Sequence, residues 1–230
     1  MDIDIRPFFI TVKVALIATV FTFVLGLLAA EFTRKIKRGK GLIDSVFTLP
    51  LILPPTVVGF FLLLIFGRNS FIGTFLNAVG VSVVFSWIGA VVAATVVSFP
   101  LMYRASRGAF EQIDQNVIYA AATLGLSEFK IFWKIKLPVA WPGVLAGTIL
   151  AFTRALGEFG ATIMLAGNIP GRTQTMAIAV YSAVQGGNRE LAYKWVAVLC
   201  LISFATIMAM NYWSGDRSVA KRKAKVTGGI

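Results

Sequence analysis

The chain contains no histidine and a single cysteine, Cys200, among its 230 residues. Zinc, haem and iron–sulfur sites draw most of their ligands from these two residue types, so their scarcity disfavours such a site. A lone cysteine also cannot form an intrachain disulfide. Without histidine the chain lacks the usual general base, and no paired carboxylates and no Ser/His or Cys/His set take its place. We therefore expect no catalytic residue, no metal site and no cofactor bound by this chain.

Charged residues are also scarce, at 14% of the chain, whereas hydrophobic residues make up 57% and include 19 phenylalanines. A soluble domain of this size needs more charge on its surface, so the composition predicts a membrane protein in contact with lipid. The formal net charge of +12 could instead indicate a nucleic-acid partner. The basic residues, however, stand in short blocks between apolar runs and form no stripe with interleaved aromatics. We expect no nucleic-acid partner.

Five apolar runs are long enough to cross a bilayer, whose hydrocarbon core of about 30 Å needs about 20 helical residues. The runs cover residues 8–30, 44–66, 83–103, 138–164 and 195–213. A sixth stretch, 175–184, is too short to cross and fits a partly inserted or surface helix. The sequence predicts an all-α membrane protein with about five transmembrane helices in a single transmembrane domain, residues 1–230.

Most of the 22 Lys and Arg residues follow the first, third and fifth runs, in segments that share one side if there are five spans. They are Arg34, Lys35, Lys37, Arg38 and Lys40; Arg104, Arg107, Lys130, Lys134 and Lys136; and Arg217, Lys221, Arg222, Lys223 and Lys225. The positive-inside bias then predicts an outside N-terminus and a cytoplasmic C-terminus. The acidic N-terminus has no basic n-region, which favours a retained first span over a cleaved signal peptide.

Proline and glycine interrupt several of these runs. Pro50, Pro54 and Pro55 lie in the second run, where freed backbone carbonyls should face protein or a wet cavity, although proline is also common in membrane helices. Gly143 and Gly147 form a small-xxx-small pair that permits close helix approach. That approach could lie within the chain or across a dimer.

The loop over residues 104–137 is amphipathic and predicts two short helices separated by Gly125, with Ser127 capping the second. A helix–glycine–helix element of this kind can dock into a groove of another protein. A helix that lies on lipid headgroups would explain the pattern nearly as well.

This loop resembles the signature of ABC importer permeases, which reads Glu-Ala-Ala, three residues, Gly, nine residues, Ile-x-Leu-Pro. In this sequence Tyr119 stands where the family has Glu, and the other landmarks fall in register when counted back from Pro138. The resemblance implies a coupling helix in the cytoplasm that contacts an ATPase. The implied ATPase-coupling residues are Tyr119, Ala120, Ala121, Gly125, Leu126, Ile135, Leu137 and Pro138.

The resemblance also implies the ABC importer permease fold, a location in the cell (inner) membrane and a set of partners. The chain has no Gly-x-x-x-x-Gly-Lys-Ser/Thr phosphate loop, so separate ABC ATPase subunits would use the ATP and Mg. An extracytoplasmic oxyanion-binding protein would deliver the solute. A second copy of the chain would complete the pathway at a two-fold axis, which makes a homodimer.

Several short stretches resemble bacterial molybdate permeases. They are residues 49–59, residues 151–162 with Leu156-Gly157-Glu158-Phe159-Gly160, Asn168-Ile169-Pro170-Gly171, Thr173-Gln174-Thr175 and Gln185-Gly186-Gly187. The resemblance implies transport of a tetrahedral oxyanion and favours molybdate. Sulfate permeases share the Leu-Gly-Glu-aromatic-Gly element, and tungstate is close to molybdate in size and charge, so both remain alternatives. A passive anion channel is the alternative of another class, but it would need no coupling helix.

Arg154 and Glu158 lie four residues apart in or near the fourth span. Charges within a membrane are costly and mark a pathway or a pair. One reading gives Arg154 a role in the anion pathway or a gate, and the other is an i,i+4 ion pair that neutralises both charges.

Overall fold

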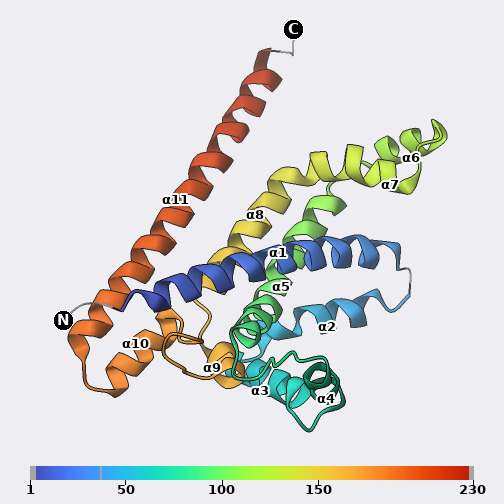
Figure 1. Ribbon diagram of the computed structural model, residues 1–230. Helices are drawn as coiled ribbons and strands as arrows, with labels where there is room; N and C mark the ends of the chain where they lie inside the picture. The colour runs from blue at the N-terminus through green and yellow to red at the C-terminus, as the bar shows by residue number, and fades with distance from the viewer. Residues whose placement is uncertain (1–3, 37, 228–230) are drawn as a thin grey trace.

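The computed structural model describes residues 4–36 and 38–227, and side chains as far as residue 209. This part of the chain consists of helices and their connections and contains no strand (Figure 1). In chain order the helices are α1 Arg6–Lys35, α2 Lys40–Ile52, α3 Pro55–Phe66, α4 Phe71–Ala78, α5 Trp87–Glu111, α6 Gln115–Thr123, α7 Glu128–Ile131, the π-helical turn η1 Phe132–Lys136, α8 Leu137–Leu156, α9 Gly160–Ala166, α10 Met176–Gln185 and α11 Arg189–Thr227.

Among the described residues, four helical stretches are long and apolar enough to cross a membrane, and the bent pair of α2 and α3 brings the number to as many as five. The four are α1, α5, the run from Glu128 to Leu156, and residues Arg189–Ala209 of α11. The predicted all-α fold class with about five transmembrane helices is confirmed. The basic side chains of the predicted tail, Arg217 to Lys225, lie outside the described side chains.

The second predicted span, 44–66, is not one continuous helix. It forms α2 and α3, and the chain direction bends by 113° from the first helix to the second. Pro54 takes an extended conformation with φ −53° and ψ 134°, and Pro55 begins α3. Two consecutive residues without an N–H cannot continue the hydrogen-bond ladder of α2, so the helix ends after Ile52. Pro50, in contrast, lies inside α2 without ending it.

The fourth predicted span, 138–164, is also divided in two. α8 ends at Leu156 and α9 begins at Gly160, with Gly157, Glu158 and Phe159 between them. α9 packs mainly against α3 and α5, whereas α8 packs against α5 and α1. The prediction of one helix over this range was wrong, because apolar composition alone does not indicate where a helix is interrupted.

The third predicted span begins and ends later than expected. α5 starts at Trp87, where the Ser86 hydroxyl caps the helix by accepting from Gly89 N at 3.3 Å. Phe85, just before it, has a positive φ of 55° and donates its N–H to the Leu165 carbonyl. Because α5 continues to Glu111, the first part of the predicted loop 104–137 is a continuation of this helix and not a loop.

α8 packs closely against α5 through the two glycines of the small-xxx-small pair. A Cβ atom on Gly143 would stand 2.7 Å from Ala109 Cβ, and one on Gly147 would stand 2.6 Å from Ala105 Cβ. The close approach therefore lies within the chain. α1 packs along the same two helices, so α1, α5 and α8 form the central body of the fold (Figure 1).

Among the short helices outside this body are α10 and α4. α10 covers nearly the residues predicted to form a short apolar helix, begins with the side-chain cap of Thr175 and packs against α11. The Thr11 hydroxyl of α1 accepts from Met176 N at 2.8 Å, which ties the start of α10 to α1. α4, begun by the cap of Ser70, was not predicted from the sequence.

Candidate functional site

The segment over residues 114–138 forms a helix–glycine–helix element that projects from the helical body, far from the N-terminus (Figure 1). Asp114 Oδ1 caps α6 by accepting from Asn116 N at 2.9 Å, and Ser127 Oγ caps α7 by accepting from Lys130 N at 3.4 Å. Between the helices Gly125 takes a left-handed conformation with φ +79°. The break at Gly125 and the cap at Ser127 are therefore where the sequence predicted them. We call residues 114–138 the coupling segment.

The coupling segment exposes apolar side chains on its projecting part. Tyr119 is 65% exposed and Leu124 is 81% exposed. The other large exposed apolar residues of the segment are Val117, Phe129 and Trp133. Apolar side chains held away from the body of the molecule are typical of a surface that another protein or lipid covers.

The predicted coupling residues divide between the tip and the root of this segment. At the tip Ala120 is exposed, Ala121 is buried and its carbonyl accepts from Leu126 N at 3.2 Å. At the root Leu137 is buried in a cluster with residues of α1 and α5, and Pro138 sits in the first turn of α8. Ile135 belongs to the π-helical turn between them. The signature thus spans the whole path from the exposed tip to the packed core.

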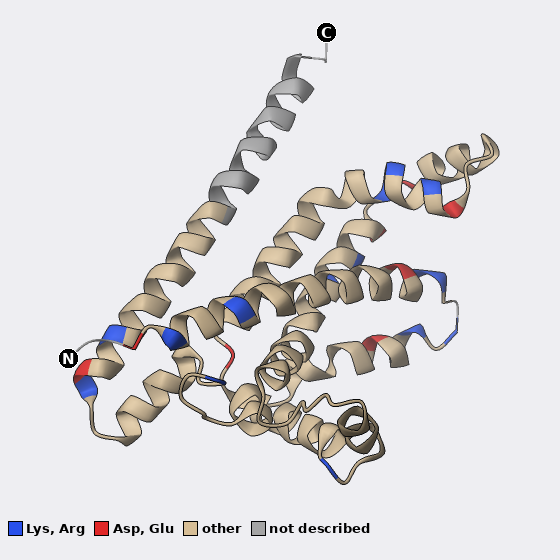
Figure 2. Cartoon of the chain, viewed as in Figure 1, with Lys and Arg blue, Asp and Glu red and all other residues tan. Residues whose placement is uncertain are grey.

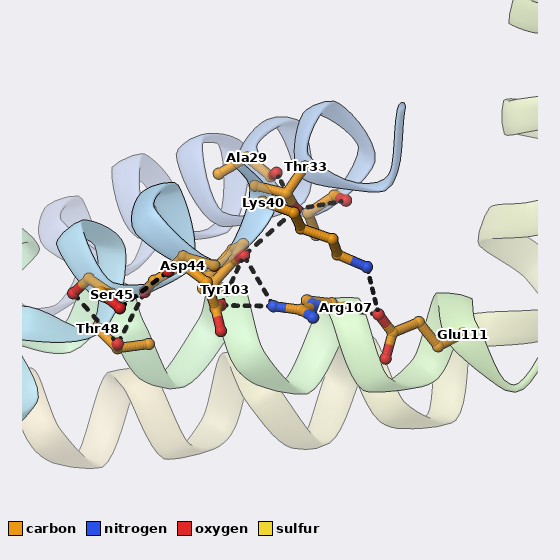
Figure 3. A network of polar contacts seen from close by, with 11 residues as sticks. Ala29, Thr33, Lys40, Asp44, Ser45, Thr48, Tyr103, Arg107 and Glu111 are labelled. Atoms are coloured by element: carbon orange, nitrogen blue, oxygen red, sulfur yellow. Dashed lines mark hydrogen bonds and ion pairs between the residues drawn. The ribbon is translucent and has the colours of Figure 1, made fainter. Parts of the chain in front are cut away.

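A polar network that the sequence did not predict joins α2 to α5 and also reaches α1, because the Tyr103 hydroxyl donates to Thr33 Oγ1 at 3.3 Å (Figure 3). Asp44 Oδ1 accepts from Arg107 Nη1 at 2.5 Å and from the Tyr103 hydroxyl at 3.0 Å. Glu111 Oε1 accepts from Arg107 Nε at 2.9 Å and from Lys40 Nζ at 3.2 Å. Opposite charges at the facing ends of two successive spans were the only sequence signal for it.

Arg154 and Glu158 are joined directly. Arg154 Nη1 donates to Glu158 Oε2 at 2.6 Å, and Glu158 Oε1 accepts from Ala161 N, in the first turn of α9, at 2.7 Å. The Glu158 side chain is 2% exposed and that of Arg154 is 29% exposed. Glu158 therefore neutralises a cation at the end of α8 and accepts a hydrogen bond from an otherwise unpaired N–H group of α9. One carboxylate thus connects the two helices across the break.

Further cations lie at the end of the molecule that carries the N-terminus. Lys13 Nζ stands 3.9 Å from the centre of the Trp87 ring, a cation–π contact between α1 and the start of α5. Arg6 Nε pairs with Asp4 Oδ1 at 2.8 Å, and this hydrogen bond holds the pKa of Asp4 below its usual value. These contacts fix the N-terminal part of α1.

Comparison with known proteins agrees with these features. Residues 22–219 match the model of the family described as binding-protein-dependent transport system inner membrane component. The molybdenum transport system permease protein ModB of Escherichia coli (strain K12) is 45% identical over 209 residues, 90% of each chain. ModB of Haemophilus influenzae is 47% identical over 196 residues, which cover 85% of this chain and 83% of the relative. The sulfate transport system permease protein CysT of Salmonella typhimurium is more distant, at 34% identity over 88% of this chain and 73% of the relative.

Solved structures show the same fold at low sequence identity. The inward-facing MetNI methionine ABC transporter matches with a TM-score of 0.71 and 18% identity, over 93% of this chain and 95% of that chain. A bacterial alginate ABC transporter, in complex with an alginate pentasaccharide-bound periplasmic protein, matches with a TM-score of 0.74 and 14% identity, over 93% and 79%. The chain is thus a multi-pass transport permease with the ABC importer fold. It belongs to the family of binding-protein-dependent transport system inner membrane components, within which it resembles the molybdenum permeases.

Proposed function

We propose that this chain is the channel-forming subunit of an ATP-driven importer that moves a tetrahedral oxyanion, molybdate, into the cytoplasm. The observation that carries the proposal is the projecting coupling segment with its exposed apolar side chains, in a chain 45% identical to a molybdenum transport permease. Docking of this segment on an ATPase gives its apolar tip a partner and gives the permease a source of energy.

The partners follow from what the chain itself does not carry. It has no phosphate-loop motif, so a separate ABC ATPase binds the ATP and Mg, and this chain binds no cofactor. An extracytoplasmic protein delivers the oxyanion, as the periplasmic protein in the alginate transporter complex suggests by analogy. Two copies of the chain form a homodimer around the pathway.

The proposed orientation places the N-terminus outside and the coupling segment in the cytoplasm. The support is the distribution of described charges: Lys and Arg residues gather where α1 ends, α2 begins and the coupling segment projects (Figure 2). Basic residues are retained on the cytoplasmic side of membrane proteins. The coupling segment then lies where a cytoplasmic ATPase can reach it.

Tyr119, Ala120, Ala121, Gly125 and Leu126 contact the ATPase in this proposal, and Ile135, Leu137 and Pro138 carry its movement into α8. Because the Arg154 and Glu158 charges neutralise each other, we propose that the pair connects α8 to α9 and does not bind the anion. Opening of the pair during transport would release Arg154 toward an anion.

Gly125 provides a direct test of the docking role. Gly125→Val should reduce ATP-driven uptake strongly, because a β-branched residue at φ +79° is strained by at least about 1–2 kcal/mol and would change the angle between α6 and α7. Gly125→Asn is the matched control, since asparagine tolerates the left-handed region. Uptake and the amount of protein in the membrane would be measured for both. Normal uptake by the valine variant would remove the docking role from this break.

The function itself is tested in proteoliposomes that contain this chain, its ATPase and its binding protein. Uptake of molybdate, tungstate and sulfate would be compared at equal low concentrations, with and without ATP. We expect ATP-dependent uptake of molybdate and no uptake of sulfate. Sulfate uptake would transfer the assignment to the branch that CysT represents, uptake of tungstate alone would make tungstate the substrate, and flux without ATP would indicate a passive channel.

A further inference from the structure

The most buried cation of the coupling segment occupies the position that the signature leaves open. Lys136 is the x of Ile-x-Leu-Pro, yet its side chain is 5% exposed. Its Nζ donates to Glu31 Oε1 at 2.7 Å, and Glu31 lies near the end of α1, 105 residues away in the sequence. Lys136 is placed there by the π-helical turn η1, which it ends. The signature identifies the segment but not this contact.

Two further ion pairs surround this contact. Arg34 Nε stands 3.3 Å from Glu31 Oε2, so both carboxylate oxygens of Glu31 face a cation. Lys35, the last residue of α1, pairs with Glu128, the first residue of α7. The end of α1 is therefore joined to the coupling segment at two places, one buried and one exposed.

Other contacts of the segment are of a different kind. Its contact with α5 includes the edge-to-face pair of Phe110 and Phe132, whose ring centres are 5.9 Å apart. This apolar contact involves no charge, whereas a buried ion pair cannot separate without leaving an unpaired charge. The polar network of Asp44 and Arg107 contains no residue of the coupling segment.

We propose that the Lys136–Glu31 pair is a positioning contact that makes α1 move together with the coupling segment during transport. The proposal rests on the proposed importer function. When an ATPase shifts the segment, the covalent link carries the movement into α8, and the buried pair carries it into α1 at the same time. Two of the three helices of the central body then move as one unit.

The first test separates this role from a purely structural one. Lys136→Met and Glu31→Gln each leave one charge of the buried pair without its main partner. The double variant leaves no charge in the pair, but Arg34 also loses its carboxylate partner in it. Arg34→Met, which keeps the Lys136–Glu31 pair, measures what the loss of that contact contributes. A structural pair replaced by neutral residues is often tolerated. If the pair transmits movement, the double variant should reach the membrane and still take up about tenfold less oxyanion per ATP hydrolysed than the wild type. Lys136→Arg should restore the ratio.

Arg104 supplies the control. It lies on α5 outside the coupling segment, is exposed and has no ion-pair partner among the described side chains. Arg104→Met should leave the ratio of uptake to ATP hydrolysis unchanged. An equal fall in the Arg104 variant, or a normal ratio in the double variant, would overturn the proposal.

A second test fixes the two elements to each other. Lys35→Cys and Glu128→Cys, in a Cys200→Ser background, would be joined by a short thiol-reactive cross-linker, with the two single-cysteine variants treated in parallel. If α1 and the segment move together, the cross-linked complex should keep at least about half of its uptake. Loss of uptake on cross-linking would show that they move apart. Absence of ATP-driven uptake in the untreated wild type would instead count against the proposed function.

Discussion

Replacing Glu158 by leucine is expected to destabilise the folded permease by about 3 kcal/mol, because it removes one partner of a buried ion pair. Arg154 would lose the carboxylate oxygen that stands 2.6 Å away. Ala161 N, in the first turn of α9, would lose Glu158 Oε1 as its hydrogen-bond acceptor. A lower melting temperature of the detergent-solubilised protein, and less protein in the membrane, would be the measured result.

A double variant is the control for this prediction. Arg154→Leu combined with Glu158→Gln removes both charges and keeps an amide oxygen for Ala161 N. Its melting temperature should lie much nearer to that of the wild type than the melting temperature of Glu158→Leu. Equal destabilisation of the two variants would mean that the volume of the Glu158 side chain, and not its charge, stabilises the connection between α8 and α9.

Replacing Gly59 by alanine should also destabilise the fold, by about 1–3 kcal/mol, through overpacking. A Cβ at this position on α3 would stand 2.7 Å from Ala161 Cα and 2.8 Å from Met164 Cβ. The nearest obstacle is backbone and cannot rotate away, so α3 and α9 must separate. The thermal stability of the purified variant measures the effect.

Gly41→Ala is the matched control for Gly59→Ala. Gly41 lies in the first turn of α2, and a Cβ there would meet nothing within 4 Å. Alanine should be neutral or slightly stabilising at this position, since glycine is the weaker helix former by about 0.5–1 kcal/mol. A loss of stability at Gly41 as large as that at Gly59 would contradict the packing argument.

The consecutive prolines show where prediction from the sequence reached its limit in the spans. The sequence located Pro54 and Pro55 as an interruption of the second run, but did not predict that the chain would turn by 113° and direct α3 against α9. The size of a bend depends on what the second half packs against. Here that surface comes from residues about a hundred positions further along the chain, such as Ala161 beside Gly59.

The candidate site shows the same division. Gly125 and Ser127 were predicted as a helix break and a cap, because both depend on neighbours within a few residues. The spacing of Arg154 and Glu158 left a pathway role and an ion pair open, and their contact was found only in the structure. Lys136 was counted with the charges that set topology, and nothing local showed that it would be buried against Glu31.

By itself, the sequence determined that the chain is an all-α membrane protein with about five spans, and it located the helix–glycine–helix segment. Apolar runs, blocks of basic residues and signature spacing are local properties of the chain. The tertiary structure alone decided the bend between α2 and α3, the break held by Glu158 and the contact of Lys136 with α1. These features depend on pairs of residues far apart in sequence. Their energy comes from burial and close packing, which exist only once the helices are assembled.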